Sequence, residues 1–127
     1  MAGRKLISSG SPYEPKVGFS RAVAVGNTVY VSGTVGRNED GSEGPPDAYL
    51  QAKLTIRTIE KALEQAGASL KDVVRTRIFL TDIKHFDDAA RAHGEAFGEI
   101  RPASSMIGVS ALADGWMLVE IEAVAVI

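Results

Sequence analysis

The feature that most constrains the fold is the order in which strand-like and helix-like spacing alternate along these 127 residues. One helical pattern begins at Asp47, a residue type suited to capping a helix N-terminus, and runs to about Ala66. Its apolar positions are Leu50, Leu54, Ile59, Leu63 and Ala66. Gly67 fits the C-terminal stop, because a residue without Cβ accepts the left-handed conformation. We therefore expect a helix over residues 47–66.

Strand-like patterns lie on both sides of this helix. Before it, the runs Ala22–Val25 and Thr28–Val31 flank the pair Gly26-Asn27. That pair suits a two-residue hairpin turn, because both residue types tolerate positive φ. After the helix, residues 73–80 alternate as expected for a strand that is buried on one side.

The C-terminal part of the chain predicts a second helix and then two strands. The helix spans about residues 85–98 and ends before Pro102, and residues 104–109 and 116–126 read as strands joined by a turn near Gly115. This order of elements predicts an α+β fold in which both helices pack on one face of a mixed sheet. The other sheet face must then be buried, and self-association is one way to bury it.

Composition sets the class of protein. The chain has the apolar fraction, 45%, and the charged fraction, 24%, of an ordinary globular protein, so we expect a single domain over residues 1–127 with one exposed loop at residues 36–46. A net charge of −2 gives no electrostatic reason to expect nucleic acid or an anionic membrane as a partner. No apolar run approaches the ~18 residues of a membrane span, and the default compartment is the cytoplasm.

Cysteine and histidine usage limits the chemistry. The chain has no cysteine, which excludes disulfides, thiolate nucleophiles and cysteine-ligated metal. Its two histidines, His85 and His93, argue against a histidine-rich metal site. We expect an exposed His85 at the start of the second helix, and a hydrogen-bonded core or interface role for His93 on its apolar face.

Three motifs together give the sequence a family resemblance. Val31-Ser32-Gly33-Thr34, Pro102-Ala103-Ser104-Ser105 and Val119-Glu120-Ile121-Glu122-Ala123-Val124-Ala125 resemble segments of the Rid/YjgF family of small proteins that handle reactive imines. The resemblance implies a chorismate-mutase-like fold and a homotrimer with clefts at the subunit interfaces. In the family's deaminases those clefts hydrolyse amino-acid-derived enamines and imines to ammonia and a 2-oxo acid, without a metal or an organic cofactor.

The resemblance also implies site residues. Glu120 matches the carboxylate that positions the attacking water, Ser32 matches the site serine, and the backbone near Met106 is expected to position the small-molecule ligand. Phe19 occupies the position of the family's site tyrosine and lacks its hydroxyl. Ser104 occupies the position at which the deaminases carry an arginine.

The serine at position 104 changes the expected chemistry. A guanidinium fork binds a substrate carboxylate bidentately, whereas the Ser104 hydroxyl offers one donor and no charge. Arg101, which precedes Pro102, is an alternative cation but is expected to point elsewhere. The sequence therefore resembles an arginine-less branch of the family, and 2-aminoacrylate deaminase activity is doubtful.

Charged residues of the strands leave alternatives open. Glu120 and Glu122 share one face of a strand. Their spacing alone is compatible with two interpretations, a pair of solvated carboxylates or a general base with a raised pKa. The resemblance favours the base for Glu120 and not for Glu122. Arg75 and Arg77 fit an anion-binding cleft, a solvated face or salt bridges.

The sequence is compatible with three hypotheses about function. They are a trimeric hydrolase of a small imine, enamine or related compound, a non-catalytic small-ligand-binding trimer, and a chaperone-like trimer. The family is sometimes labelled as endoribonuclease. The sequence does not support that activity, because it has no basic stripe or aromatic platform for binding RNA and no histidine pair suited to phosphodiester cleavage.

Overall fold

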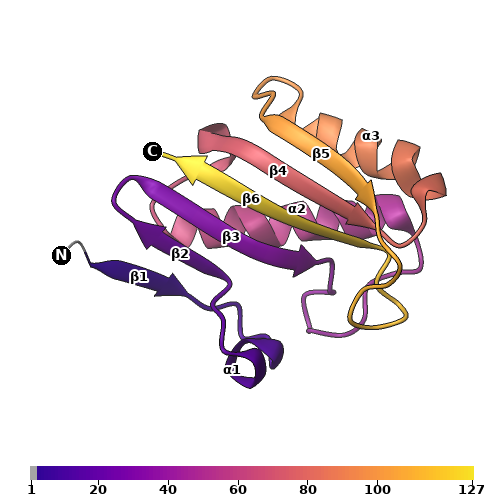
Figure 1. Cartoon of the computed structure of the whole chain (residues 1–127), viewed down its shortest axis with the longest axis horizontal. Coiled ribbons are helices and arrows are strands. Elements are labelled where there is room, and N and C mark those ends of the chain that lie inside the picture. Colours follow the sequence, from indigo (N-terminus) through magenta and orange to yellow (C-terminus); the bar gives the residue numbers. More distant parts are fainter. Residues whose placement is uncertain (1–2) are drawn as a thin grey trace.

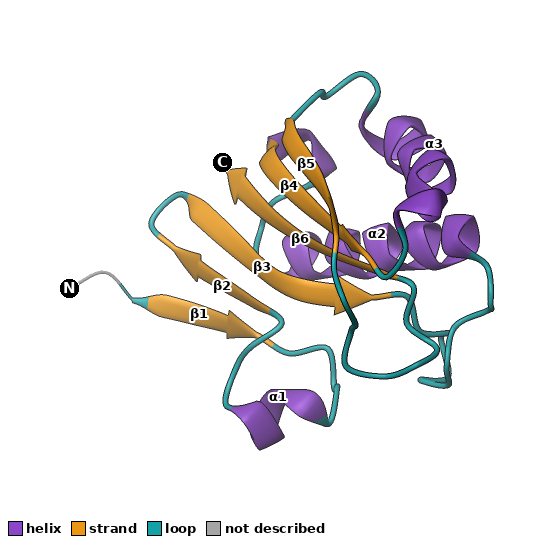
Figure 2. Ribbon diagram, turned by 45° about the vertical axis from the view of Figure 1, so that its right-hand side comes forward, coloured by secondary structure: helices purple, strands orange, loops and turns teal. Residues whose placement is uncertain are grey.

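A six-stranded mixed sheet with two long helices on one face makes up most of the protein (Figures 1 and 2). The structure, a computed structural model, describes residues 3–127, so the first two residues of the predicted domain lie outside it. The elements are β1 (Arg4–Ile7), α1 (Tyr13–Val17), β2 (Ala22–Val25), β3 (Thr28–Val35), α2 (Ala48–Gln65), the 3₁₀ turns η1 (Leu70–Asp72) and η2 (Ile83–His85), β4 (Val73–Leu80), α3 (Phe86–Phe97), β5 (Ala103–Gly108) and β6 (Val119–Val126). The predicted α+β class is confirmed.

Local capping explains the bounds of α2. The Asp47 carboxylate accepts a hydrogen bond of 2.9 Å from the backbone N–H of Leu50, and Gly67 follows the helix with a φ of +86°. Residues such as Ile59 and Leu63 are buried against the sheet. Leu50, expected on the apolar face, is instead 44% exposed, because the buried side of the first turn is formed by Ala48, Gln51 and Ala52.

The sheet order is β1-β2-β3-β6-β4-β5, and only the β4–β5 pair is parallel. The hairpin prediction is confirmed, with Val25 paired to Thr28 across the Gly26-Asn27 turn. The pairing of β3 with β6 is irregular between Val31 and Thr34, which bends β3 beside the candidate site.

The two C-terminal strands are joined through a turn near Gly115, as expected, but they do not pair with each other. β5 pairs with β4 at the sheet edge, while β6 lies between β3 and β4. Residues 109–118, including Trp116, form the loop that carries the chain from β5 back to the centre of the sheet. Because β4 lies between β5 and β6, the chain must pass from one side of β4 to the other, and a tight hairpin cannot make this connection. β1 and α1, which span only four and five residues, were not predicted from the sequence.

The segment at residues 36–46 is exposed over residues 38–43, as expected, but glycines near both of its ends are packed closely. Gly36 is buried, and a Cβ at this position would collide with the carbonyl oxygen of Gln51 in α2. A Cβ at Gly44 would in turn collide with the Gly36 carbonyl. Glycines therefore allow the segment to pack directly against the N-terminal turns of α2.

The two sheet faces differ in cover. The helix-bearing face supplies the core, which includes Val31, Ile78 and Ile121. The open face carries Tyr30, which is 52% exposed, together with half-buried charged residues. None of the helices within residues 3–127 is long and apolar enough to cross a membrane.

Candidate functional site

Glu120 lies on the open face of β6, opposite Val35 of β3 and Phe79 of β4. Its side chain extends over Gly33, where an added Cβ would lie 2.7 Å from the Glu120 Oε2 atom. Position 33 therefore admits no side chain while the carboxylate occupies this place. The irregular stretch of β3 and its glycine together make room for Glu120.

The surroundings of Glu120 favour its protonated form. Burial of the Glu120 carboxyl raises its pKa, and the like charge of Glu122 raises it further. The nearby Arg21 acts to lower the pKa, but the net shift is upward. Within residues 3–127 no side chain or backbone group donates a hydrogen bond to this carboxylate. A half-buried carboxylate with a raised pKa is a better base than an exposed one, and its oxygens are available to a water molecule.

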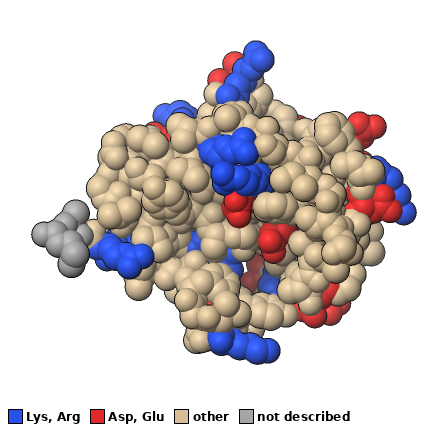
Figure 3. Space-filling view, in the orientation of Figure 1, with Lys and Arg blue, Asp and Glu red and all other residues tan. Residues whose placement is uncertain are grey.

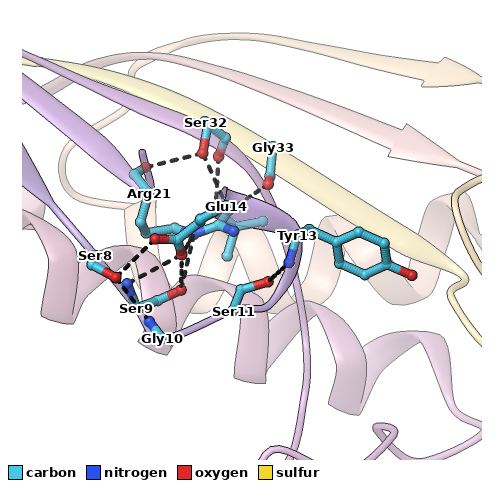
Figure 4. A network of polar contacts seen from close by, with 10 residues as sticks. Ser8, Ser9, Gly10, Ser11, Tyr13, Glu14, Arg21, Ser32 and Gly33 are labelled. Atoms are coloured by element: carbon cyan, nitrogen blue, oxygen red, sulfur yellow. Dashed lines mark hydrogen bonds and ion pairs between the residues drawn. The ribbon is translucent and has the colours of Figure 1, made fainter. Parts of the chain in front are cut away.

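Arg21 holds the irregular part of β3 in shape (Figure 4). Arg21 is 6% exposed, and its Nη1 atom donates to the Gly33 carbonyl at 2.5 Å and to the Thr34 hydroxyl at 3.0 Å. Nη1 also donates to the Ser32 hydroxyl at 3.2 Å, and that hydroxyl donates to the Arg21 carbonyl at 3.0 Å. The predicted site residue Ser32 is thus engaged with Arg21 through both its donor and its acceptor.

Glu14 is the buried counter-charge of Arg21. Its Oε2 atom lies 3.7 Å from the Arg21 Nε and accepts a hydrogen bond from the Ser9 hydroxyl at 2.5 Å, while its Oε1 atom accepts one from the Ser8 hydroxyl at 2.9 Å. Burial acts to raise the pKa of Glu14, but the hydrogen bonds from Ser9 and Ser8 outweigh it and hold the pKa below its usual value. This network ties the segment around α1 to Ser32 and Gly33 of β3 (Figure 4).

Two cavities meet at Phe19. A hollow of about 600 Å³ is lined by Phe19, Gly33 and Glu120 together with α2 and the loop after β3. The space-filling view shows this hollow with acidic and basic atoms at its edge (Figure 3). A second groove of about 550 Å³ on the open face is lined by Phe19 and Ser32. One chain therefore brings Phe19, Ser32 and Glu120 into one region.

Ser104 and Met106 lie elsewhere in the chain. They belong to the edge strand β5 and share the helix-bearing face, since they pair with Thr76 and Ile78 of β4. The Thr76 hydroxyl donates to the Ser104 hydroxyl at 2.8 Å. Both residues are two strands away from Glu120 and on the opposite face, so a single chain does not bring them to it.

His93 extends the polar contacts of Ser104. Its Nε2 atom lies 2.9 Å from the Thr76 hydroxyl, and burial lowers its pKa. This agrees with the hydrogen-bonded role expected for His93. Arg101 is exposed with a φ of +56°, and it is not among the residues that line the two cavities.

The other charged side chains of β4 and β6 have polar partners. Arg77 forms a 3.0 Å salt bridge with Glu122, and Arg75 donates to the Ser105 hydroxyl at 2.9 Å. Glu122 therefore has a cationic partner, whereas Glu120 has none in direct contact. Within residues 3–127 no group of three or more histidine or acidic side chains is arranged to hold a metal ion.

Comparison with known proteins places this chain in a family. A family model described as Endoribonuclease L-PSP matches residues 10–127. The chain belongs to that family. A 2-iminobutanoate/2-iminopropanoate deaminase of Dermatophagoides farinae is 35% identical over 130 residues, covering 100% of this chain and 99% of the relative. A RutC family protein of Pyrococcus abyssi is 36% identical over 126 residues, covering 98% of each chain.

Solved structures of family members agree with the fold. A member of the YjgF/YER057c/UK114 family from Mycobacterium tuberculosis is 47% identical, with a TM-score of 0.90, and the match covers 98% of this chain and 100% of that one. A putative endoribonuclease from Thermotoga maritima is 31% identical, with a TM-score of 0.83, covering 97% and 92%. These matches support the family resemblance drawn from the motifs at Ser32, Ser104 and Glu120.

Arg21 and Glu14 are the site residues that sequence reasoning missed. Arg21 directly precedes a predicted strand, and Glu14 lies in a short segment without clear periodicity. Nothing local marks them as partners. The one available signal was Gly33 in the Val-Ser-Gly-Thr motif, because a glycine inside a strand indicates a bulge or a close approach.

Proposed function

We propose that this protein is a homotrimer that hydrolyses a small imine, enamine or related compound in clefts between its subunits. The observation that carries the proposal is the half-buried Glu120 carboxylate, which faces a cavity and has a raised pKa. Family relatives named as 2-iminobutanoate/2-iminopropanoate deaminases support the same class of reaction. A hollow of about 600 Å³ suits a small metabolite.

The chemistry follows from the position of Glu120. The carboxylate accepts a proton from a water molecule while the water oxygen forms a bond to the imine carbon. The imine reacts in its protonated form, so the π electrons of the C=N bond move to a nitrogen that becomes a neutral amine. Glu120 then passes the proton it took from water to this nitrogen. The hydroxyl proton moves to the Glu120 carboxylate as the carbonyl forms and the C–N bond breaks, and ammonia leaves and carries that proton away as ammonium. Gly33 keeps the space beside the carboxylate free for this exchange.

A cleft between subunits is required if Ser104 and Met106 contribute to the site. Both lie on the edge strand β5, on the face opposite Glu120, so they can approach it only from a second copy. The open sheet face is available for that contact, since none of the helices within residues 3–127 covers it. We expect light scattering at micromolar concentration to give three times the 13.4 kDa subunit mass. A monomer mass would contradict the proposal.

The substrate range depends on Ser104. A charge-assisted hydrogen bond contributes about 1.5–3 kcal/mol, so the absence of an arginine fork should slow hydrolysis of 2-aminoacrylate by roughly ten- to a hundredfold or more. A coupled assay that generates the enamine and follows pyruvate should show slow turnover and a gain in Ser104→Arg. Incomplete gain is expected, because Phe19 lacks the hydroxyl of the family tyrosine. Wild-type activity equal to that of an arginine-containing deaminase would refute this reasoning.

The second candidate is a non-catalytic trimer that binds a small ligand. The neutral hydroxyl of Ser104, already bonded to Thr76, favours it. Assays with imines that do and do not carry a carboxylate separate the two, because a binding protein turns over neither. The ribonuclease activity in the family description is not extended to this chain, since neither histidine lines either cavity.

A further inference from the structure

The hollow beside Glu120 collects positive charge. Although the chain has a net charge of −2, four cationic side chains and only two carboxylates line this cavity. They are Arg21, Arg37, Arg57 and Lys61 against Glu39 and Glu120. A concentration of cations in one concave site, against the sign of the whole molecule, indicates a ligand that carries negative charge.

Two of these cations lie on one stripe of α2. Arg57 and Lys61 are four residues apart, so their side chains extend from the same side of the helix. The only ionic partner of Arg57 within residues 3–127 is Glu39, at 4.0 Å, and both side chains are largely exposed. Such a pair contributes little, and a ligand can displace it. Lys61 forms no ion pair with any described residue.

The third cation, Arg37, is held in place by its neighbours. Its guanidinium carbon lies 5.2 Å from the centre of the Trp116 ring, and Nη1 donates to the Gly41 carbonyl at 3.3 Å. This contact fixes a half-buried guanidinium while its Nε and Nη2 atoms make no hydrogen bond within the described residues. A preorganised guanidinium with free donors is suited to a carboxylate or a phosphate.

Arg21 does not belong to this group. It is buried, it is neutralised by Glu14, and its donors hold β3 in shape. The cations that remain for a ligand are Arg37, Arg57 and Lys61, which we call the basic end of the cavity. Glu120 lines the same cavity.

We propose that the basic end binds the anionic group of a small molecule, while the reacting carbon of that molecule lies beside Glu120. The substrate class is then an imine or enamine whose phosphate or carboxylate is separated from the reacting carbon by several bonds. This assignment of a substrate rests on the proposed function. Anion binding at the basic end does not rest on it. The absence of an arginine at position 104 is consistent with an anchor at a distance from the reacting carbon.

The test is an NMR titration of the ¹⁵N-labelled protein at constant ionic strength. Inorganic phosphate and succinate are the two probes, and they separate a phosphate ligand from a carboxylate ligand. We expect saturable shifts in the backbone amides around Arg37, Arg57 and Lys61 with at least one probe. Arg57→Ala and Lys61→Ala should each weaken binding by roughly three- to tenfold, since each removes a charged hydrogen-bond donor. Lys71→Ala, at an exposed lysine outside the cavity lining, is the matched control.

The outcomes decide between the two proposals. Shifts that do not saturate with either probe, or equal weakening by Lys71→Ala, overturn the anion site, because both indicate general attraction by charge. Saturable binding that depends on Arg57 and Lys61, in a protein that hydrolyses no imine, supports the anion site and refutes only the proposed reaction. If hydrolysis is observed, Arg57→Ala should raise KM for imines with a remote anionic group more than it raises KM for uncharged imines, and Lys71→Ala should change neither.

Discussion

Removal of the Arg21 side-chain charge tests whether the buried network maintains the site. Arg21→Met keeps the apolar length of the side chain but removes the donors to Gly33 and Thr34. It also leaves the Glu14 carboxylate, which is 5% exposed, without its counter-charge. Removing one partner of a buried ion pair costs about 3–5 kcal/mol. Since folded domains are stable by about 5–15 kcal/mol, the variant should lose a large fraction of its stability.

The magnitude can be divided between charge and hydrogen bonds. Glu14→Gln removes the negative charge, so the double variant Arg21→Met/Glu14→Gln leaves no buried unpaired ion. We expect the double variant to cost less than the sum of the two single variants, with a coupling of about 1–3 kcal/mol. Equal costs for the double variant and the sum would show that the ion pair contributes no coupling.

The assay is urea unfolding at neutral pH and fixed protein concentration, followed by far-ultraviolet circular dichroism. Lys84→Met is the control, because its ion pair with Asp82 spans 3.8 Å between largely exposed side chains and should cost less than about 1 kcal/mol. A cost below about 1 kcal/mol for Arg21→Met as well would refute the view that this guanidinium maintains the shape of β3.

Three further predictions concern single positions. Glu120→Gln should abolish turnover yet stabilise the fold at neutral pH. The pKa of Glu120 is raised in the folded state, so the wild-type protein loses stability as pH rises from about 4.3, the pKa of an unperturbed Glu, through the higher pKa of the folded state. Thermal melting temperatures of wild type and Glu120→Gln should therefore diverge across that pH range. Gly36→Ala should lower stability by over about 2 kcal/mol in urea, because its Cβ meets the Gln51 carbonyl. Thr76→Val should cost about 1–3 kcal/mol by leaving His93 unbonded, whereas Thr76→Ser should restore most of it.

The parts of the fold that follow from short-range chemistry were predictable from the sequence. The ends of α2 are set by Asp47 and Gly67, which act on backbone groups within a few residues. The hairpin at Gly26-Asn27 is local in the same sense. β1 escaped notice because only Ile7 of its four residues is buried, so it carries no alternating pattern.

The arrangement of the candidate site depends on long-range pairing, and for that reason the sequence alone does not predict it. Glu120 reaches Gly33 only because β6 pairs with β3 and the register shifts beside this glycine. Ser104 faces the helices because β5 runs parallel to β4 in one particular register, and a slip by one residue would turn it to the other face. Motif resemblance identified these residues but carried no information on which face each occupies.

The central place of β6 has a consequence for synthesis of the protein on the ribosome. β6 is the last strand in the sequence, yet in the sheet it joins β1-β2-β3 on one side to β4-β5 on the other. Until it emerges, the nascent chain holds two partial sheets with unpaired edges, at β3 and at β4, which are exposed to aberrant pairing. The strand that carries Glu120 therefore also completes the sheet, so a chain stalled or cleaved before Val119 lacks both the candidate base and the joined sheet.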